Sequence, residues 1–170
     1  MERKVWDLLV RIFHWCSAVI FFVNYWILED GQWHEWLGYG LAFLLCVRFF
    51  WGFVGTRHAR FSDFFPTPRR LKSYLSGVSR NQESETVEHN PVGSLMVLTL
   101  MFSLMGLVMT GWFMELDVFW GVGWPEEVHE LLANWIMFLV GIHVAVVLFY
   151  DLVLKRGLIR AMVTGCKNSV

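Results

Sequence analysis

VHELLANWIMFLVGIH, residues 128–143, places two histidines on one long apolar segment, which carries no charge from Leu131 to Tyr150. An α-helix turns about 100° and rises about 1.5 Å per residue. His129 and His143 are fourteen residues apart, so they differ by about 40° around the helix axis and by about 21 Å along it. Because a bilayer core is about 30 Å thick, the segment predicts a membrane-spanning helix that presents imidazole on one face at two depths.

Three more segments are apolar enough to span a bilayer, which takes about 20 residues of helix. No residue is charged in 12–28 or 91–114, and Arg48 is the only charge in 36–53. Hydrophobic residues make up 56% of the chain and charged residues 17%, which is unlike a soluble domain. The sequence therefore predicts one all-α domain over residues 1–170, an integral membrane four-helix bundle. Its expected helices are 7–28, 33–54, 91–114 and 128–151.

Positive charge gathers on one side of this predicted bundle. All 14 lysines and arginines lie before or at the start of the first helix, between Arg48 in the last part of the second helix and residue 80, or after the fourth helix. Cytoplasmic loops near helix ends retain lysine and arginine, so both termini and the 57–89 loop are expected in the cytoplasm. The net charge of −1 gives no indication of a nucleic-acid partner. The opposite connections carry Glu29, Asp30, Glu35, Glu115, Asp117, Glu126, Glu127 and Glu130.

Four histidines form two pairs that match in depth. His14 and His143 each lie one to two turns inside the cytoplasmic ends of their helices, whereas His34 and His129 open theirs on the outer side. Low-spin haem iron takes two opposed nitrogen ligands, and neutral imidazole supplies them without adding charge. Two histidines without a nearby cysteine or carboxylate suit zinc poorly. The sequence therefore predicts two haems, held non-covalently since no C-x-x-C-H motif occurs, by His14/His143 and His34/His129.

Other residues fit this interpretation less specifically. Ala18, Gly38 and Ala133 each follow a proposed ligand by four residues, where a small side chain would let a porphyrin approach the helix backbone. Arg48, inside the second span, would either extend to lipid headgroups or pair with a haem propionate, and the propionate is preferred. His58 is expected to be a solvated loop residue, and His89 an interfacial one.

Five short motifs resemble those of the bacterial cytochrome b561 family, which includes the cytochrome b subunits of nickel-iron hydrogenases. The resemblance implies a four-helix core with two b haems, whose axial ligands are the four paired histidines. It also implies electron exchange with a membrane quinone, in a multi-pass protein of the bacterial inner membrane. The motifs are RIFHW (11–15), HEWLG (34–38) running on to Arg48, HNPVG (89–93), VHELLAN (128–134) and GIH (141–143).

Three functions follow from these features. The preferred one is electron transfer between the quinone pool and a periplasmic partner, a c-type cytochrome or a dehydrogenase, docked at the acidic, tryptophan-rich connection 115–127. The alternative is a superoxide:quinone oxidoreductase that needs no protein partner, although the outer loops lack the cations that would attract an anion. A non-redox membrane subunit with proton-relaying histidines is the third. Whether the chain is itself an enzyme, and whether it forms a homodimer in the lipid membrane, are left open.

Overall fold

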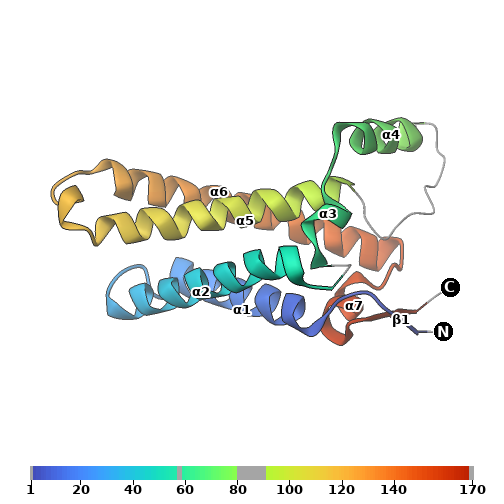
Figure 1. Cartoon of the computed structure of the whole chain (residues 1–170), viewed down its shortest axis with the longest axis horizontal. Helices are drawn as coiled ribbons and strands as arrows, with labels where there is room; N and C mark the ends of the chain where they lie inside the picture. The colour runs from blue at the N-terminus through green and yellow to red at the C-terminus, as the bar shows by residue number, and fades with distance from the viewer. Residues whose placement is uncertain (1, 57–58, 80–90, 169–170) are drawn as a thin grey trace.

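Four long helices lie side by side in the computed structural model, which describes residues 2–56, 59–79 and 91–168 (Figure 1). Each is long and apolar enough to cross a membrane, so the predicted all-α membrane four-helix bundle is confirmed. The last helix begins four residues earlier than expected, because Pro125 occupies its first turn, where a missing N–H costs nothing. The helices are α1 (Leu8–Trp26), α2 (Gln32–Val54), α5 (Pro91–Met114) and α6 (Trp124–Leu148).

The hydrophobic core lies midway along the bundle. Helix α5 packs mainly on α6, α1 packs on α2, and α2 also contacts α5. Ile136 on α6 is only 1% exposed and is seven residues from both His129 and His143, so the core separates the two histidine levels. Large apolar side chains such as Phe102 also cover the outside of the bundle, as expected where lipid replaces water. The core residues are Phe21, Leu41, Leu45, Leu104, Leu107 and Ile136.

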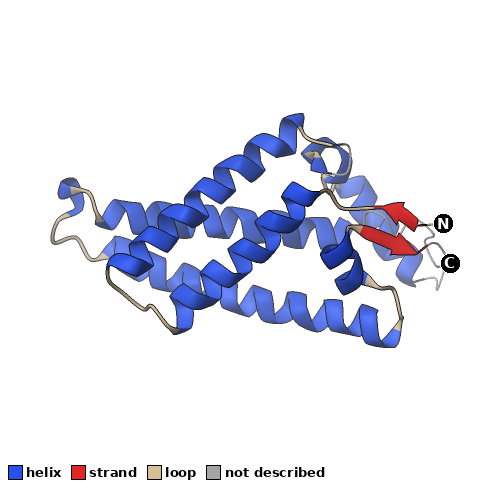
Figure 2. Cartoon of the chain, turned by 90° about the horizontal axis from the view of Figure 1, so that it is seen from below, coloured by secondary structure: helices blue, strands red, loops and turns tan. Residues whose placement is uncertain are grey.

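Both chain termini lie at one end of the bundle, which we call the terminal end; the opposite end, with the connections 27–31 and 115–123, is the turn end (Figures 1 and 2). At the terminal end, β1 (Glu2–Lys4) pairs antiparallel with β2 (Cys166–Asn168). Beside them lies α7 (Leu158–Thr164). The Arg11 guanidinium donates to the backbone carbonyls of Met162 and Val163. These contacts tie the start of α1 to the C-terminal segment.

The expected loop 57–89 is partly helical. Its described part holds α3 (Phe61–Phe64) and α4 (Pro68–Ser79). A proline at the first position suits α4, because the ring already has a helical φ and needs no backbone partner. His58 and His89 lie outside the described residues. The motif that begins at His89 is described only from Pro91 onwards.

Two short helices complete the described chain. The connection after α5 contains η3 (Asp117–Phe119), a single 3₁₀ turn. Helix α6 continues into η4 (Phe149–Val153), one turn of π-helix. Such turns often occur at functional sites, and this one begins six residues after His143. The path of α6 therefore changes just past its second histidine.

Candidate functional site

His14 on α1 and His143 on α6 face each other near the terminal end, and we call them the terminal-end pair. Their ring centroids are 6.3 Å apart, with the planes tilted by 55°. Nδ1 of His14 is buried and has no hydrogen-bond partner within the described part of the chain. Two helices that are far apart in the sequence thus bring two imidazoles to one level.

His34 on α2 and His129 on α6 form the corresponding turn-end pair. Their ring centroids are 6.1 Å apart and their planes are tilted by 58°. The structure therefore brings together the same two pairs that depth in the membrane had suggested. Their role as haem ligands stays a prediction.

The spacing within both pairs leaves room for a metal. A metal–imidazole bond is about 2 Å long, and the bonded nitrogen lies about 1.1 Å from the ring centre, so two opposed ligands have centroids about 6 Å apart. The distances of 6.3 and 6.1 Å agree with this value. Next to His34, no atom lies within 4 Å of the position that a Cβ on Gly38 would take. Open space is thus present on the helix face where the macrocycle of a haem would lie.

The turn-end histidines are oriented by hydrogen bonds at Nδ1. Nδ1 of His34 lies 2.6 Å from the carbonyl oxygen of Leu28, which only accepts, so this nitrogen carries the proton. Nδ2 of Asn24 donates to the backbone carbonyl of His34 at 3.1 Å. The Nε2 lone pair of His34 is therefore free to bind iron.

The hydroxyl of Thr110 on α5 orients His129 through a hydrogen bond at Nδ1. This hydroxyl oxygen lies 3.1 Å from Nδ1 of His129, and 2.9 and 3.0 Å from the carbonyl oxygens of Leu107 and Gly106. A hydroxyl has one proton, which goes to a backbone carbonyl, so the oxygen accepts from the histidine. Gly111 makes room for the ring, because a Cβ there would lie 3.3 Å from Cε1 of His129. Sequence reasoning gave no role to α5, although Thr110 and Gly111 interrupt an otherwise strongly apolar helix.

Arg48 is buried at about the depth of the terminal-end pair. It follows His34 by fourteen residues on α2, the same spacing that separates His129 from His143, so it lies on the same helix face and about 21 Å deeper. Its side chain is 4% exposed, and Nη1 has no hydrogen-bond partner among the described residues. The guanidinium carbon lies 5.2 Å from the centre of the Phe61 ring, a cation–π contact. Such burial does not fit a side chain that extends to lipid headgroups.

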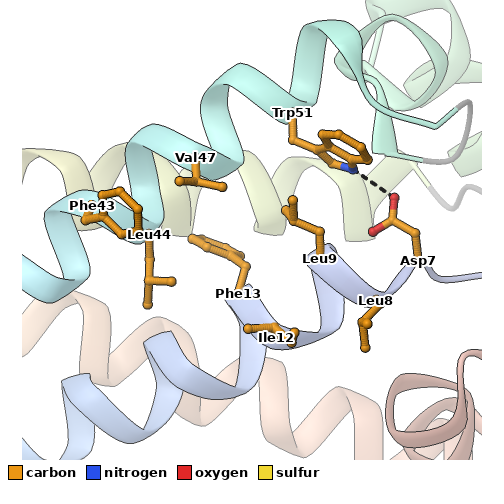
Figure 3. Close-up of a pocket in the computed structure, with 9 residues that line it drawn as sticks. All are labelled: Asp7, Leu8, Leu9, Ile12, Phe13, Phe43, Leu44, Val47 and Trp51. Atoms are coloured by element: carbon orange, nitrogen blue, oxygen red, sulfur yellow. Dashed lines mark hydrogen bonds between the residues drawn. The ribbon is translucent and has the colours of Figure 1, made fainter.

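An apolar cavity of about 420 Å³ lies between α1 and α2 in the terminal half of the bundle (Figure 3). Phe13 and Val47, which line it, are the sequence neighbours of His14 and Arg48. None of the described histidines lines the cavity, so it is separate from the histidine pairs. Its lining is Asp7, Leu8, Leu9, Ile12, Phe13, Phe43, Leu44, Val47 and Trp51.

Asp7 closes the terminal end of this cavity. Its carboxylate caps α1 by accepting from the backbone N–H of Val10 at 2.8 Å, and it also accepts from Trp51 Nε1 at 2.9 Å and from the Thr56 hydroxyl at 2.6 Å. Burial alone would raise the pKa of Asp7, but these hydrogen bonds, together with the positive charge of Arg48, hold it below its ordinary value. The carboxylate thus ties the start of α1 to the end of α2.

The turn end carries only negative formal charge. All eight acidic residues of the two outer connections and the adjoining helix ends are exposed, and no lysine or arginine occurs near them in the sequence. Trp120 between them is 89% exposed. This end of the molecule is therefore acidic and aromatic.

Histidines that face each other at two levels of a membrane-length helical bundle are the arrangement expected of a membrane-bound b-type cytochrome. Comparison with known proteins agrees: the family model described as prokaryotic cytochrome b561 matches residues 5–165. The chain belongs to the prokaryotic cytochrome b561 family, and it has a b-type haem and an electron-transfer role in a bacterial membrane.

Two curated relatives cover nearly the whole chain. Both are described as probable Ni/Fe-hydrogenase 1 B-type cytochrome subunits, one from Escherichia coli strain K12 and one from Escherichia coli O157:H7. Each relative is 23% identical to this chain, and the match covers 99% of this chain and 92% of the relative. No solved structure gives a significant match.

Proposed function

We propose that the protein is a di-haem b-type cytochrome that passes electrons between the quinone pool and a periplasmic redox partner. The observation that carries this proposal is the pair of facing imidazoles at each of two levels, with centroid distances of 6.3 and 6.1 Å. In this proposal His14 and His143 hold one haem, and His34 and His129 hold the other. Each bound haem supplies a one-electron carrier, and the two levels together cover most of the bilayer core.

The protein's own residues prepare both sites. The Leu28 carbonyl and the Thr110 hydroxyl accept hydrogen bonds from Nδ1 of His34 and His129, which leaves Nε2 of each ring available for iron. We propose that Arg48 pairs with a propionate of the terminal-end haem, because a buried guanidinium needs an anion and Nη1 has no partner among the described residues.

The terminal end faces the cytoplasm of the bacterial inner membrane in this proposal. The positive-inside rule supports this orientation, since the lysines and arginines belong to the terminal end and to the segments around α3 and α4. The acidic turn end then faces the periplasm. There it would meet a redox enzyme, as the relatives' description as hydrogenase subunits suggests, or a small c-type cytochrome with a basic surface.

Quinone exchange is proposed at the cavity between α1 and α2. Its apolar lining suits a hydrocarbon tail, and the exposed side chains of Leu8, Ile12 and Phe43 connect it to the lipid. Phe13, which lines the cavity, is the sequence neighbour of His14 in the terminal-end pair. An electron that reached this pair would therefore be close to a membrane-soluble acceptor.

The two other candidate functions are less well supported. Superoxide oxidation at the turn end would bring an anion to a surface whose formal charges are all negative. A non-redox role does not agree with membership of a cytochrome family.

A reduced-minus-oxidised absorption spectrum of the purified chain, with haem measured per chain, tests the proposal. We expect two b haems. His14→Ala and His143→Ala should leave the same single haem, and His34→Ala and His129→Ala should leave the other, because each pair shares one iron. His58→Ala is the control and should retain both haems. The proposal is wrong if the chain binds no haem, or if His14→Ala leaves the same haem as His129→Ala.

A further inference from the structure

The two histidine pairs differ in what lies behind the rings. Nδ1 of His34 and Nδ1 of His129 each have an acceptor, at 2.6 Å and 3.1 Å. Nδ1 of His14 is buried without a partner in the described part of the molecule. The turn-end pair is therefore hydrogen-bonded on both sides, and the terminal-end pair is not.

An acceptor behind a ligating histidine changes the metal as well as the ring orientation. When Nδ1–H donates a hydrogen bond, electron density at Nε2 increases and the imidazole becomes a more basic ligand. A more basic ligand stabilises ferric iron over ferrous iron, which lowers the reduction potential of a haem. By this effect the turn-end haem should be the harder of the two to reduce.

The surrounding charges act in the same direction. Arg48, buried at the level of the terminal-end pair, favours the extra electron there, and its field is little screened at that depth. The eight carboxylates at the turn end oppose an added electron near them, although their exposure weakens the effect in salt. Hydrogen bonding and charge thus both favour an electron at the terminal end.

We propose that Thr110 is a positioning residue that fixes the proton of His129 on Nδ1, and that the turn-end haem has the lower reduction potential of the two. With a haem at each pair, an electron that entered at the turn end would then be transferred energetically downhill, with oxidation of the turn-end haem and reduction of the terminal-end haem. This inference rests on the proposed function, since it requires a haem at each pair.

Thr110 is suited to a clean test because its hydroxyl has a defined geometry. Thr110→Val removes the acceptor and keeps the shape, and Thr110→Ser keeps the acceptor. Thr110→Ala is measured alongside, in case the valine methyl group disturbs the ring. Thr99→Val is a matched control on α5, eleven residues away, because within the described part of the chain no hydrogen bond joins Thr99 to a histidine ring.

Spectroelectrochemical titration of the haem-loaded chain is the measurement. We expect Thr110→Val and Thr110→Ala to raise the reduction potential of one haem. At a fixed applied potential, the ratio of reduced to oxidised form of that haem should change two- to tenfold, about the value of one hydrogen bond. Thr110→Ser and Thr99→Val should leave both potentials unchanged. In a His14→Ala background, which keeps only the turn-end haem, the remaining potential should be the lower one and should shift with Thr110→Val.

Two results would overturn the inference: a turn-end haem with the higher potential, or potentials that do not respond to loss of the Thr110 hydroxyl. Either result would leave the di-haem proposal intact, because both haems would still be bound. A chain without haem would instead refute the proposed function itself.

Discussion

Single residues at the two histidine levels have distinct tasks that their positions explain. Histidine is the proposed ligand, but Leu28 and Thr110 decide which ring nitrogen is free at the turn end. Gly111 is small because a Cβ there would crowd the His129 ring. At the terminal end, Arg48 supplies the buried positive charge. A ligand set alone therefore describes only part of each site.

Arg48 gives the first prediction at this scale. Arg48→Met should weaken retention of the terminal-end haem by roughly 100-fold or more, because removing one partner of a buried ion pair costs about 3–5 kcal/mol. Arg48→Lys, which keeps the charge, should retain more of this haem. Haem loss during dialysis against apomyoglobin measures the effect, and the turn-end haem is the internal control. Equal retention in the methionine variant and the unmodified protein would rule out the propionate contact.

The helices are joined at the terminal end by contacts at the ends of the membrane-spanning segments. Asp7 connects the start of α1 to Trp51 and Thr56 at the end of α2. Gly52 lets Phe61 of α3 pack against α2, since a Cβ there would overlap the Phe61 ring. The two-stranded β1–β2 ribbon joins the chain termini. These contacts hold α1, α2 and α7 in register near the terminal-end pair.

Asp7→Asn should lower stability near neutral pH by about 1 kcal/mol, a value reduced for the partial exposure of the site. Asparagine still caps the helix, but it is neutral and offers only one acceptor oxygen. Because the folded pKa of Asp7 is below its ordinary value, the carboxylate stabilises the fold above about pH 4 and loses this effect as pH falls through the folded pKa.

Thermal unfolding in detergent at pH 7 and at acid pH measures this difference. The difference in unfolding temperature between the unmodified protein and Asp7→Asn should become smaller as the pH falls. Asp117→Asn, at the exposed turn end, is the control and should have little effect at either pH. A difference in unfolding temperature that becomes larger at acid pH would contradict the assigned hydrogen bonds.

The cavity between α1 and α2 gives a second prediction at the scale of helices. Leu44→Trp should fill much of it and slow quinone reduction several-fold, while both haems remain bound, since no histidine lines the cavity. Phe102→Trp, on the exposed face of α5, adds a similar ring elsewhere and should change nothing. Stopped-flow oxidation of the pre-reduced protein by a soluble quinone is the measurement. An unchanged rate in Leu44→Trp would exclude the cavity as the quinone site.

The whole molecule has an acidic end and an end with the basic residues, joined by an apolar middle. This polarity follows the helix axes (Figure 1). The two histidine pairs are separated along the same direction, because His129 and His143 are fourteen residues apart on α6. Charge at the turn end acts on partners before contact, because long-range attraction raises association rates. The acidic turn end is therefore the surface where a basic partner would first be attracted.

The acidic turn end should control the rate of docking. Replacing Glu115, Asp117, Glu126 and Glu127 by their amides should slow electron exchange with a basic c-type cytochrome about tenfold at low salt. The difference should vanish at high salt, where exposed charges are screened. Stopped-flow kinetics across ionic strength measures both, with a neutral soluble reductant as the control. Rates that are equal at low salt would exclude these carboxylates from docking.

The sequence by itself determined the four spans, the pairing of histidines by depth and the family. These features follow from local rules: helix periodicity, the thickness of a bilayer and the side on which arginine and lysine occur. The fourteen-residue spacing on the last helix needs no knowledge of its neighbours.

Only the tertiary structure decided which groups lie behind each ring. Thr110 meets His129 because α5 packs on α6, and no periodicity within α5 specifies that rotation. The same holds for Phe61 beside Arg48, for the helices in the 57–89 loop and for the β1–β2 ribbon between segments at opposite ends of the chain. Such contacts depend on how separate elements rotate and pack against one another, which a local pattern along one helix does not contain.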